Sequence, residues 1–242
     1  MNATDAESPA YHAVVPAAGA GSRMNSDTPK QYIDINGRSM LLHTIERLLQ
    51  VESLQSIVVV LDKVTFDDPP LKFYHPKIST CVGGSSRAES VQKGLLHLAA
   101  TADPASWVLV HDAARPCVRV EDIARLISQT AGSEGGLLAM PVVDTLKRAD
   151  SSLKAIETVD RTDLWRAATP QLFPYHLLLQ ALSSALEEGT DITDEASAMQ
   201  HAGYNPVLVE CSADNIKVTS ATDIALAEHY LAVQKAEKSS VQ

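Results

Sequence analysis

The chain has 242 residues, 45% of them hydrophobic and 21% charged, which suffices to bury the core of one large domain. Its formal net charge of −10 makes a nucleic-acid backbone or an anionic membrane unfavourable as the main partner. If an acidic protein binds phosphates, it must gather its few cations at one site and recruit a divalent metal ion as well. Clusters of Arg and Lys are therefore the most informative positions in this sequence.

The ends of the chain and its cysteines narrow the class of protein. Residues 1–10 are polar and acidic, unlike a secretory signal, and no apolar run approaches the ~20 residues that span a bilayer. Cys81, Cys117 and Cys211 are odd in number and widely spaced, which fits neither a disulfide framework nor a paired-cysteine metal site. We predict a cytoplasmic protein with reduced, mostly buried cysteines. Its single domain should span 11–234, between a flexible N-terminus at 1–10 and a flexible tail at 235–242.

Short apolar runs rich in Val, Leu and Ile alternate along the chain with stretches of helical spacing. Strands are predicted at 13–15, 57–61, 78–82, 107–110, 136–140 and 206–209, and helices at 41–49, 88–100, 123–130, 175–186 and 221–231. This alternation is typical of a Rossmann-like α/β fold, a mostly parallel sheet with helices on both faces. Ligands bind such folds beyond the carboxyl ends of the strands. The site is therefore expected in the loops at 16–30, 83–90 and 111–116.

The stretch at 141–171 departs from this pattern. Apolar and polar residues alternate on either side of a polar turn at 150–152, which is typical of a β-hairpin. A two-stranded hairpin is marginal in water on its own, so a second subunit is the natural candidate to cover it. We therefore predict a projecting β-hairpin arm used in dimerisation.

The strongest motif is the run of small residues at 16–22, followed by Arg23 and by Lys30 within Pro29-Lys30-Gln31. Small residues directly after a buried strand let backbone N–H groups approach a phosphate chain, and the two cations add positive charge. An ordinary strand-to-helix turn would explain a bare Gly-x-Gly, but the added cations favour phosphate binding. Met24 stands where a dinucleotide fingerprint needs its third glycine, and no Walker A sequence follows.

Two more motifs follow predicted strands. Gly83-Gly84 opens a helix whose N-terminus can bind an anion or a base, although a simple helix cap by Ser85 or Ser86 explains it equally well. Asp112 is placed to hold Mg²⁺.

Arg115 follows Asp112 and could clamp a phosphate, the alternative being a surface ion pair between the two. His111 is interpreted as a core histidine. The polar clusters on the hairpin are equally consistent with a solvated face. Thr193 is the plausible cap of a following helix, and Lys217 among apolar neighbours is typical of a strand edge.

Together these motifs resemble the 2-C-methyl-D-erythritol 4-phosphate cytidylyltransferase family of the non-mevalonate route to isoprenoid precursors. The resemblance runs from about residue 13 to 230. It rests on Pro16-Ala17-Ala18-Gly19 through Arg23, Pro29-Lys30-Gln31-Tyr32, Gly83-Gly84 with Arg87 and Ser90, His111-Asp112-Ala113-Ala114-Arg115-Pro116, Thr193-Asp194-Glu195-Ala196 and Asn215-Ile216-Lys217. It implies a homodimer that uses Mg²⁺ or another divalent cation to transfer CMP from CTP to 2-C-methyl-D-erythritol 4-phosphate, releasing pyrophosphate.

The resemblance also implies roles for individual residues. The catalytic residues would be Arg23, Lys30, Arg161 and Lys217. CTP would be bound by Pro16, Ala17, Ala18, Gly19, Gly84, Ser85, Ser90 and Ala113. The acceptor would be bound by Asp112, Arg115, Thr145, Arg161, Thr169, Thr193 and Lys217, and Asp112 would also hold the metal.

In the family the arm reaches into the neighbouring subunit, so Thr145 and Arg161 would act across the dimer interface. Many relatives carry an acidic residue where this chain has Ser85, which leaves open whether Ser85 contacts cytidine through its side chain or its backbone.

The implied chemistry needs no general base, because the acceptor's own phosphate is the nucleophile and is ionised at neutral pH. This agrees with the lack of a convincing Ser–His–Asp or Cys–His arrangement in the sequence. Two other functions stay open. One is a cytidylyltransferase for another polyol phosphate such as ribitol 5-phosphate, and the other is a nucleotide-sensing module without catalysis. The cations and Asp112 speak against the second.

Overall fold

The computed structural model of the chain describes residues 9–19, 29–67, 69 and 73–240. The elements, in chain order, are β1 Tyr11–Pro16, η2 Lys30–Tyr32, β2 Asp34–Ile35, β3 Arg38–Ser39, α1 Met40–Leu49, β4 Leu54–Leu61, α2 Lys63–Asp67, β5 Ile78–Val82, α3 Arg87–Leu98, β6 Trp107–Val110, α4 Val120–Gln129, β7 Gly136–Pro141, β8 Leu146–Ala149, β9 Ala155–Val159, β10 Trp165–Pro174, α5 Tyr175–Glu187, α6 Glu195–His201, β11 Val207–Glu210 and α7 Ala221–Ser239. Each predicted strand and helix is present; β5 and β6 have the predicted bounds, and the others differ at one or both ends.

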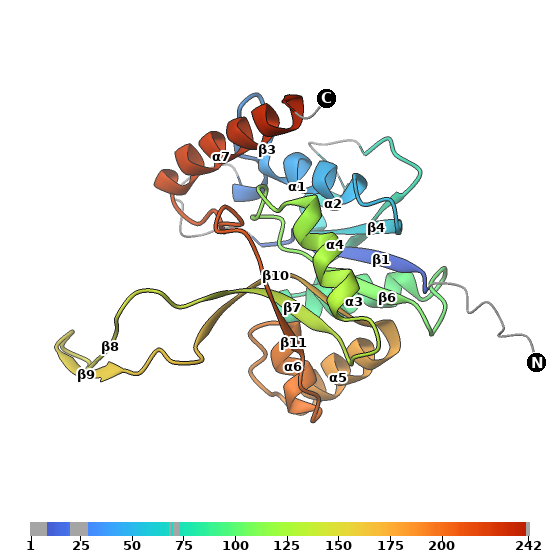
Figure 1. Cartoon of the computed structure of the whole chain (residues 1–242). Coiled ribbons are helices and arrows are strands. Elements are labelled where there is room, and N and C mark those ends of the chain that lie inside the picture. Colours follow the sequence, from blue (N-terminus) through green and yellow to red (C-terminus); the bar gives the residue numbers. More distant parts are fainter. Residues whose placement is uncertain (1–8, 20–28, 68, 70–72, 241–242) are drawn as a thin grey trace, which may run out of the picture.

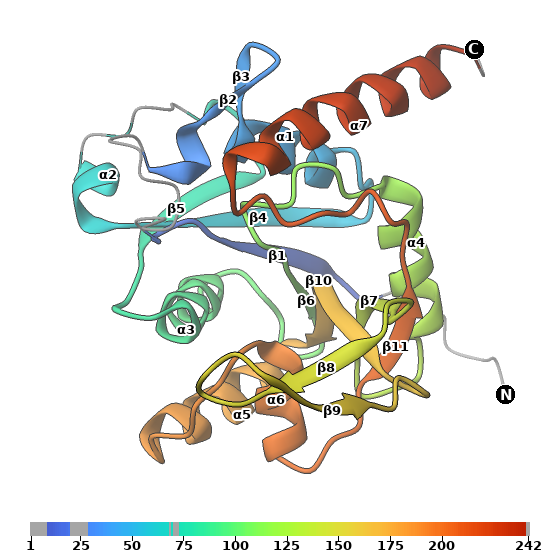
Figure 2. The same cartoon turned by 90° about the vertical axis from the view of Figure 1, so that its left-hand side faces the viewer.

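A seven-stranded sheet of order β11-β7-β10-β6-β1-β4-β5 forms the centre of the molecule (Figures 1 and 2). Strands β6, β1, β4 and β5 pair in parallel, as do β11 and β7, whereas β10 is antiparallel to both of its neighbours. Parallel neighbours need crossover helices, and the sequence supplies them between most strands. The predicted α/β fold with a mostly parallel sheet is confirmed.

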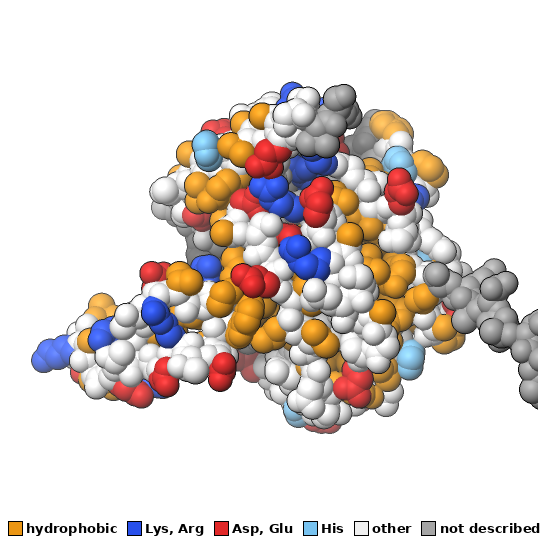
Figure 3. Space-filling view, in the orientation of Figure 1, with side chains coloured by type: hydrophobic (Ala, Val, Ile, Leu, Met, Phe, Trp, Pro, Cys, Tyr) orange, Lys and Arg blue, Asp and Glu red, His pale blue; other side chains and the backbone are white. Residues whose placement is uncertain are grey.

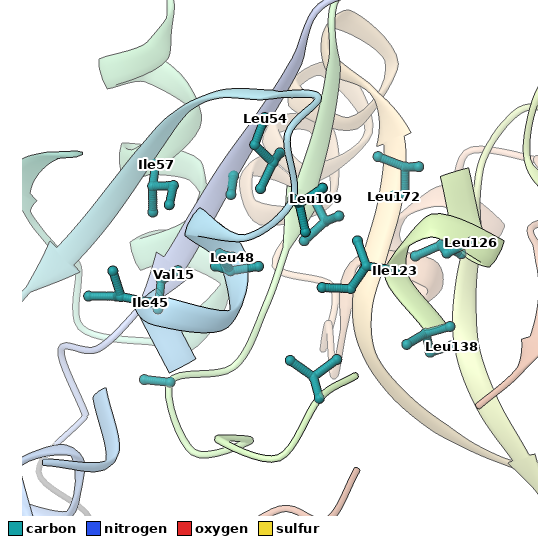
Figure 4. Close-up of a cluster of buried hydrophobic side chains, with 14 of the residues drawn as sticks. Val15, Ile45, Leu48, Leu54, Ile57, Leu109, Ile123, Leu126, Leu138 and Leu172 are labelled. Carbon is teal, nitrogen blue, oxygen red and sulfur yellow. The ribbon is translucent and has the colours of Figure 1, made fainter. Parts of the chain in front are cut away.

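Helices cover both faces of this sheet because side chains of successive strand residues point to opposite sides. Val15 of β1 packs in one core cluster with helices α1 and α4, whereas Val14 packs in a second cluster with α3, α5 and α6. Figure 4 shows the first cluster, in which Ile45 and Leu48 of α1 and Ile123 of α4 meet the strand residues. A third, smaller cluster lies under α7.

The arm projects from the domain as predicted (Figure 1). It consists of β8 and β9, which pair antiparallel around a turn where Asp150 Oδ1 accepts hydrogen bonds from the backbone N–H groups of Ser152 and Lys154, at 2.9 and 3.0 Å. The expected range of 141–171 is too long at its C-terminal end, because Trp165 begins β10 and pairs with Pro141 of β7. The segment outside the main sheet is therefore 142–164.

Helix α7 continues beyond the predicted end of the domain at residue 234. Its last turns, at 235–239, consist largely of Ala, Glu and Lys, which are strong helix formers. The expected flexible tail is thus helical as far as Ser239, and Gln234 itself is buried. Residues 1–8 of the expected flexible N-terminus, and 241–242, lie outside the described residues.

The three cysteines are free, with Cys117 and Cys211 buried and Cys81 half-buried. Burial raises the pKa of Cys81 to about 11 and that of Cys117 to about 12, so both thiols are protonated at neutral pH. Within the described residues, none of the helices is long and apolar enough to cross a membrane.

Candidate active site

A cavity of about 290 Å³ opens where the loops after β1, β5 and β6 meet. These are the three loops that the sequence predicted to hold the site, and a fourth segment, between β11 and α7, completes the lining. The lining residues are Pro16, Ala17, Ala18, Gly19, Lys30, Gln31, Gly84, Ser85, Ser86, Arg87, Ser90, Asp112, Ala113, Ala114, Lys217 and Thr219. The carboxyl ends of the parallel strands therefore converge on one cavity, as expected for this fold.

The loop after β1 lies against the sheet through its backbone. The Ala17 N–H group donates to the carbonyl oxygen of Val60 at 2.8 Å, and the buried side chain of Gln31 donates to the carbonyl oxygen of Ala17 at 2.9 Å. Gln31 belongs to the short helix η2, which also places Lys30 at the cavity. Arg23, expected in the same loop, lies outside the described residues.

The loop after β5 has no room for side chains at its two glycines. A Cβ atom at Gly83 would lie 2.7 Å from Ala18 Cβ, and one at Gly84 would lie 2.4 Å from Glu89 Cβ. Ser90 Oγ accepts a hydrogen bond from the Gly84 N–H group at 3.1 Å. Gly83 therefore lets the loops after β1 and β5 approach each other, and Gly84 leaves room for the Glu89 side chain beside its own loop.

Ser86 caps helix α3 by accepting a hydrogen bond from the Glu89 N–H group, so one of the two predicted caps is confirmed. The Glu89 carboxylate also accepts hydrogen bonds from Ser85, through its N–H group at 2.7 Å and its hydroxyl at 2.8 Å. A carboxylate thus binds this loop even though the residue at position 85 is a serine.

Asp112 lies at the floor of the cavity among three cations. Lys217 Nζ lies 2.7 Å from its Oδ2 atom, Arg87 Nε donates to Oδ1 at 3.0 Å, and Arg115 Nε lies 3.9 Å from Oδ2. Burial alone would raise the pKa of Asp112, but the charges of Arg87 and Lys217 outweigh it and hold that pKa well below its usual range. The carboxylate is therefore ionised at neutral pH.

Arg87 joins Asp112 to a residue far away in the sequence. Its Nη1 and Nη2 atoms lie 2.7 and 3.1 Å from the two carboxylate oxygens of Glu195, which is 1% exposed at the start of α6. Paired, parallel bonds of this kind are the strongest that an arginine forms. The sequence predicted a role for neither residue, because each already fitted a simple helix start.

A buried hydrogen-bonded chain fixes the backbone on the other side of Asp112. The Asp112 N–H group donates to Thr169 Oγ1 at 3.0 Å, and Thr169 Oγ1 lies 2.9 Å from His111 Nδ1. His111 Nε2 lies 3.1 Å from the carbonyl oxygen of Arg115, which can only accept, so Nε2 carries the proton and Nδ1 accepts from the threonine. Burial lowers the pKa of His111 to about 4, so it is neutral at pH 7, in line with its interpretation as a core histidine.

Arg115 is 8% exposed, which excludes the alternative of a surface ion pair. Its Nη1 atom donates to the carbonyl oxygen of Asn215 at 2.7 Å, and Asn215 Nδ2 donates to the carbonyl oxygen of Thr169 at 2.9 Å. Arg115 and Thr169 therefore support the cavity from behind and do not line it. Asn215 precedes Lys217 by two residues, so these bonds also hold the Lys217 segment in place.

A model of the IspD family, described as 2-C-methyl-D-erythritol 4-phosphate cytidylyltransferase, matches residues 11–233. The chain belongs to this family. The 2-C-methyl-D-erythritol 4-phosphate cytidylyltransferase of Yersinia pseudotuberculosis is 51% identical over 226 residues, which are 92% of each chain.

Two solved structures of IspD enzymes are also similar. The Francisella tularensis structure has a TM-score of 0.80 and 35% identity, covering 91% of this chain and 99% of that one. The Thermus thermophilus structure has a TM-score of 0.74 and 29% identity, covering 90% and 96%.

Three of the expected site residues of this IspD chain lie away from the cavity. Thr145 and Arg161 are exposed at the base of the arm, and Arg161 donates to the carbonyl oxygen of Val143 there. Thr193 is also exposed, and the cap of α6 is Asp194, whose side chain accepts from the Ser197 N–H group, so the prediction of Thr193 as cap was wrong by one residue. A single chain does not bring these residues to the cavity.

Asp112 is the one carboxylate among the described residues that line the cavity, and the described part of the chain holds no cluster of three metal-binding side chains. A single carboxylate fits Mg²⁺, which is commonly held by one or two carboxylates together with substrate phosphates and water. Both Asp112 oxygens contact cations here, so such an ion would share the carboxylate with Lys217 or displace it. The residues present therefore fit a metal ion that arrives with a nucleotide.

Proposed function

We propose that this IspD chain transfers CMP from CTP to 2-C-methyl-D-erythritol 4-phosphate, yielding 4-diphosphocytidyl-2-C-methyl-D-erythritol and pyrophosphate. The observation that carries the proposal is the charge of the cavity. Three cations, Lys30, Arg87 and Lys217, and one carboxylate, Asp112, line it, in a chain whose formal net charge is −10. Family membership supplies the identity of the substrates.

The nucleotide fits the side of the cavity made by the loops after β1 and β5. Small residues at 16–19 and the paired glycines let a ligand approach the backbone closely, and the N-terminus of α3 favours negative charge nearby. We assign CTP binding to Pro16, Ala17, Ala18, Gly19, Gly84, Ser85, Ser90 and Ala113, all of which line the cavity. Ser85 would contact cytidine through its backbone or hydroxyl, while Glu89 holds it in place.

Catalysis needs charge neutralisation more than proton transfer, because an acceptor phosphate must attack a triphosphate. Lys30 is placed to stabilise charge on the α-phosphate and the leaving pyrophosphate, and we assign Arg23 the same role. Lys217, whose side chain is 41% exposed, can contact Asp112 and the acceptor phosphate from one position. Mg²⁺, when bound by Asp112, would neutralise further phosphate charge.

The acceptor site is incomplete in a single chain, which supports a homodimer. The arm exposes Val143, Leu153 and Ile156, with 69, 88 and 61% of their surface accessible, and it extends into solvent (Figure 3). In a homodimer, the second subunit would cover these side chains. Thr145 and Arg161 of one subunit would then reach the cavity of the other. With Asp112 and Lys217 of the cavity, these two residues would form the acceptor site, and Arg115 and Thr169 would support it from behind. Thr193 does not line the cavity, so its contact with the acceptor stays a prediction. A cytoplasmic location remains a prediction.

The test is pyrophosphate release by the purified chain with CTP, Mg²⁺ and 2-C-methyl-D-erythritol 4-phosphate. Parallel reactions contain ribitol 5-phosphate or one of the other three nucleoside triphosphates. Release only with the first pair supports the proposal, whereas release with ribitol 5-phosphate favours the alternative acceptor. Tight CTP binding without any release would favour a nucleotide-sensing module.

Variants then test the assigned roles. Lys30→Ala should lower kcat on the order of 10²-fold while CTP binding weakens much less, because a contact that neutralises transition-state charge is lost. Arg23→Ala should behave in the same way. The matched control is Lys63→Ala, which removes a lysine paired with Asp67 on the surface of α2. Normal turnover of Lys30→Ala would refute the catalytic role.

A further inference from the structure

The Lys217–Asp112 ion pair joins two separate loops, one after β6 and one between β11 and α7. The relative position of these loops sets the 2.7 Å distance between Lys217 Nζ and Asp112 Oδ2. A third element, helix α7, contacts both loops behind the cavity. Besides the apolar contacts of Ala227 and Leu231, it does so through the polar side chain of Gln234, which is 3% exposed.

The Gln234 amide uses all of its hydrogen-bonding groups. Its Nε2 atom donates to the carbonyl oxygen of Cys117 at 2.9 Å, in the chain after β6, and to Asp214 Oδ2 at 2.8 Å, in the loop before α7. Its Oε1 atom accepts from Arg47 Nη2 at 2.6 Å. One amide thus bridges the two loops whose charged residues meet in the cavity.

An apolar residue would pack at this position without forming the bridge. Ala227, Leu231 and Gln234 lie at helical spacing on the buried face of α7, and the first two belong to the apolar cluster beneath it. A buried amide destabilises a protein unless its hydrogen-bonding groups are paired. The glutamine therefore contributes specific bonds where a leucine would contribute only packing.

The bridge lies close to Lys217 along the chain. Asp214, which receives the Gln234 bond, also accepts from Arg119 Nε at 2.7 Å. On the other side of Lys217, the Val218 N–H group donates to the carbonyl oxygen of Ala114 at 2.8 Å. The backbone of Lys217 lies between these two attachments. The Arg119–Asp214 and Arg115–Asn215 bonds hold the same segment, so loss of the Gln234 bond loosens its first end without releasing it.

We propose that Gln234 is a positioning residue for the reaction: it fixes the distance between Lys217 and Asp112 without contacting substrate. The proposal rests on the function proposed above for Lys217. Loss of the bridge should lower kcat about tenfold or more, since small misplacements of a positioned group have effects of this size or larger. The KM for CTP should change less than kcat, because most residues assigned to CTP binding lie in the loops after β1 and β5, which form no part of the bridge.

The test compares Gln234→Leu and Gln234→Glu with Leu231→Ala, a control that removes apolar packing from the same helix face. Both Gln234 variants should lose kcat, with KM for CTP near the wild-type value, whereas Leu231→Ala should lower Tm and keep kcat. Gln234→Glu places a second carboxylate against Asp214.

Hydrogen exchange of the backbone at 212–218 gives a readout that does not depend on activity. Gln234→Leu should speed exchange there more than Leu231→Ala does. Near-normal kcat and unchanged exchange in Gln234→Leu would overturn the proposal. So would a kcat that simply follows Tm across all the variants. An inactive wild-type chain would refute the proposed function, and the exchange comparison would still decide the role of Gln234.

Discussion

Replacing Arg87 with Met measures how strongly the ion pairs below the cavity stabilise the fold. The change leaves Glu195, 1% exposed, and Asp112, 7% exposed, without the cation that they share. Removing one partner of a buried pair costs about 3–5 kcal/mol. The Arg87 side chain is itself 29% exposed, so we expect a loss near the lower end, about 3 kcal/mol. At about 2–4 °C per kcal/mol for a chain of this size, Tm should fall by roughly 6–12 °C.

Urea unfolding at neutral pH and fixed protein concentration provides the measurement. The matched control is Arg148→Met, which breaks the Arg148–Glu157 pair of the arm, also 2.7 Å long but 60 and 54% exposed, and should cost at most about 1 kcal/mol. Replacing Arg87 and Glu195 together should recover most of the loss, because removal of both charges of a buried pair is often close to neutral. Equal, small losses in Arg87→Met and Arg148→Met would refute the argument from burial.

Two further predictions concern pH and loop packing. The pKa of His111 is lowered from 6.5 to about 4 in the folded chain, so the unfolded chain binds more protons between these values and the free energy of unfolding should fall by about 3 kcal/mol as pH drops from 6.5 to 4. Urea unfolding across this range should show that slope, and His111→Gln should flatten it. An equal slope in the variant would contradict the assignment. Gly83→Ala would place a Cβ atom 2.7 Å from Ala18 Cβ and 2.8 Å from Ser90 Oγ, and the resulting strain of about 1–3 kcal/mol should weaken CTP binding about tenfold or more in calorimetry. Lys63→Ala, on the surface of α2 and outside the cavity lining, is the control, and equal affinities would count against the packing argument.

The sequence predicted six of the seven strands of the main sheet because buried parallel strands are runs of Val, Leu and Ile. Strand β10 was not predicted, since Pro170, Gln171 and Pro174 interrupt its apolar pattern and proline is normally excluded from central strands. The pairing of β10 with β7 shifts register between Ala167 and Gln171, which accommodates Pro170. Its place in the sheet depends on the return of the chain from the arm, which no local pattern encodes.

The predicted location of the candidate site agrees with the cavity where the prediction depended on topology. The rule for the carboxyl ends of strands located the three loops, and the cavity lies between them. The prediction failed where partners are distant: Arg87 and Glu195 are 108 residues apart, and each has a local explanation as part of a helix start. The sequence predicted no role for Gln234, which it placed as the last residue of the domain. Its partners Cys117 and Asp214 are distant in the sequence and approach it only in the folded chain.

Strand β10 links the arm to the cavity. Its first residues, Trp165–Ala167, pair with the last residues of β7 at the base of the arm, and Thr169 accepts the hydrogen bond from the Asp112 N–H group. A force applied to the arm is therefore transmitted along β10 to the backbone of the loop that carries Asp112. The arm and Asp112 are thus connected through one strand, so a second subunit bound to the arm, as proposed, would also act on the backbone at Asp112.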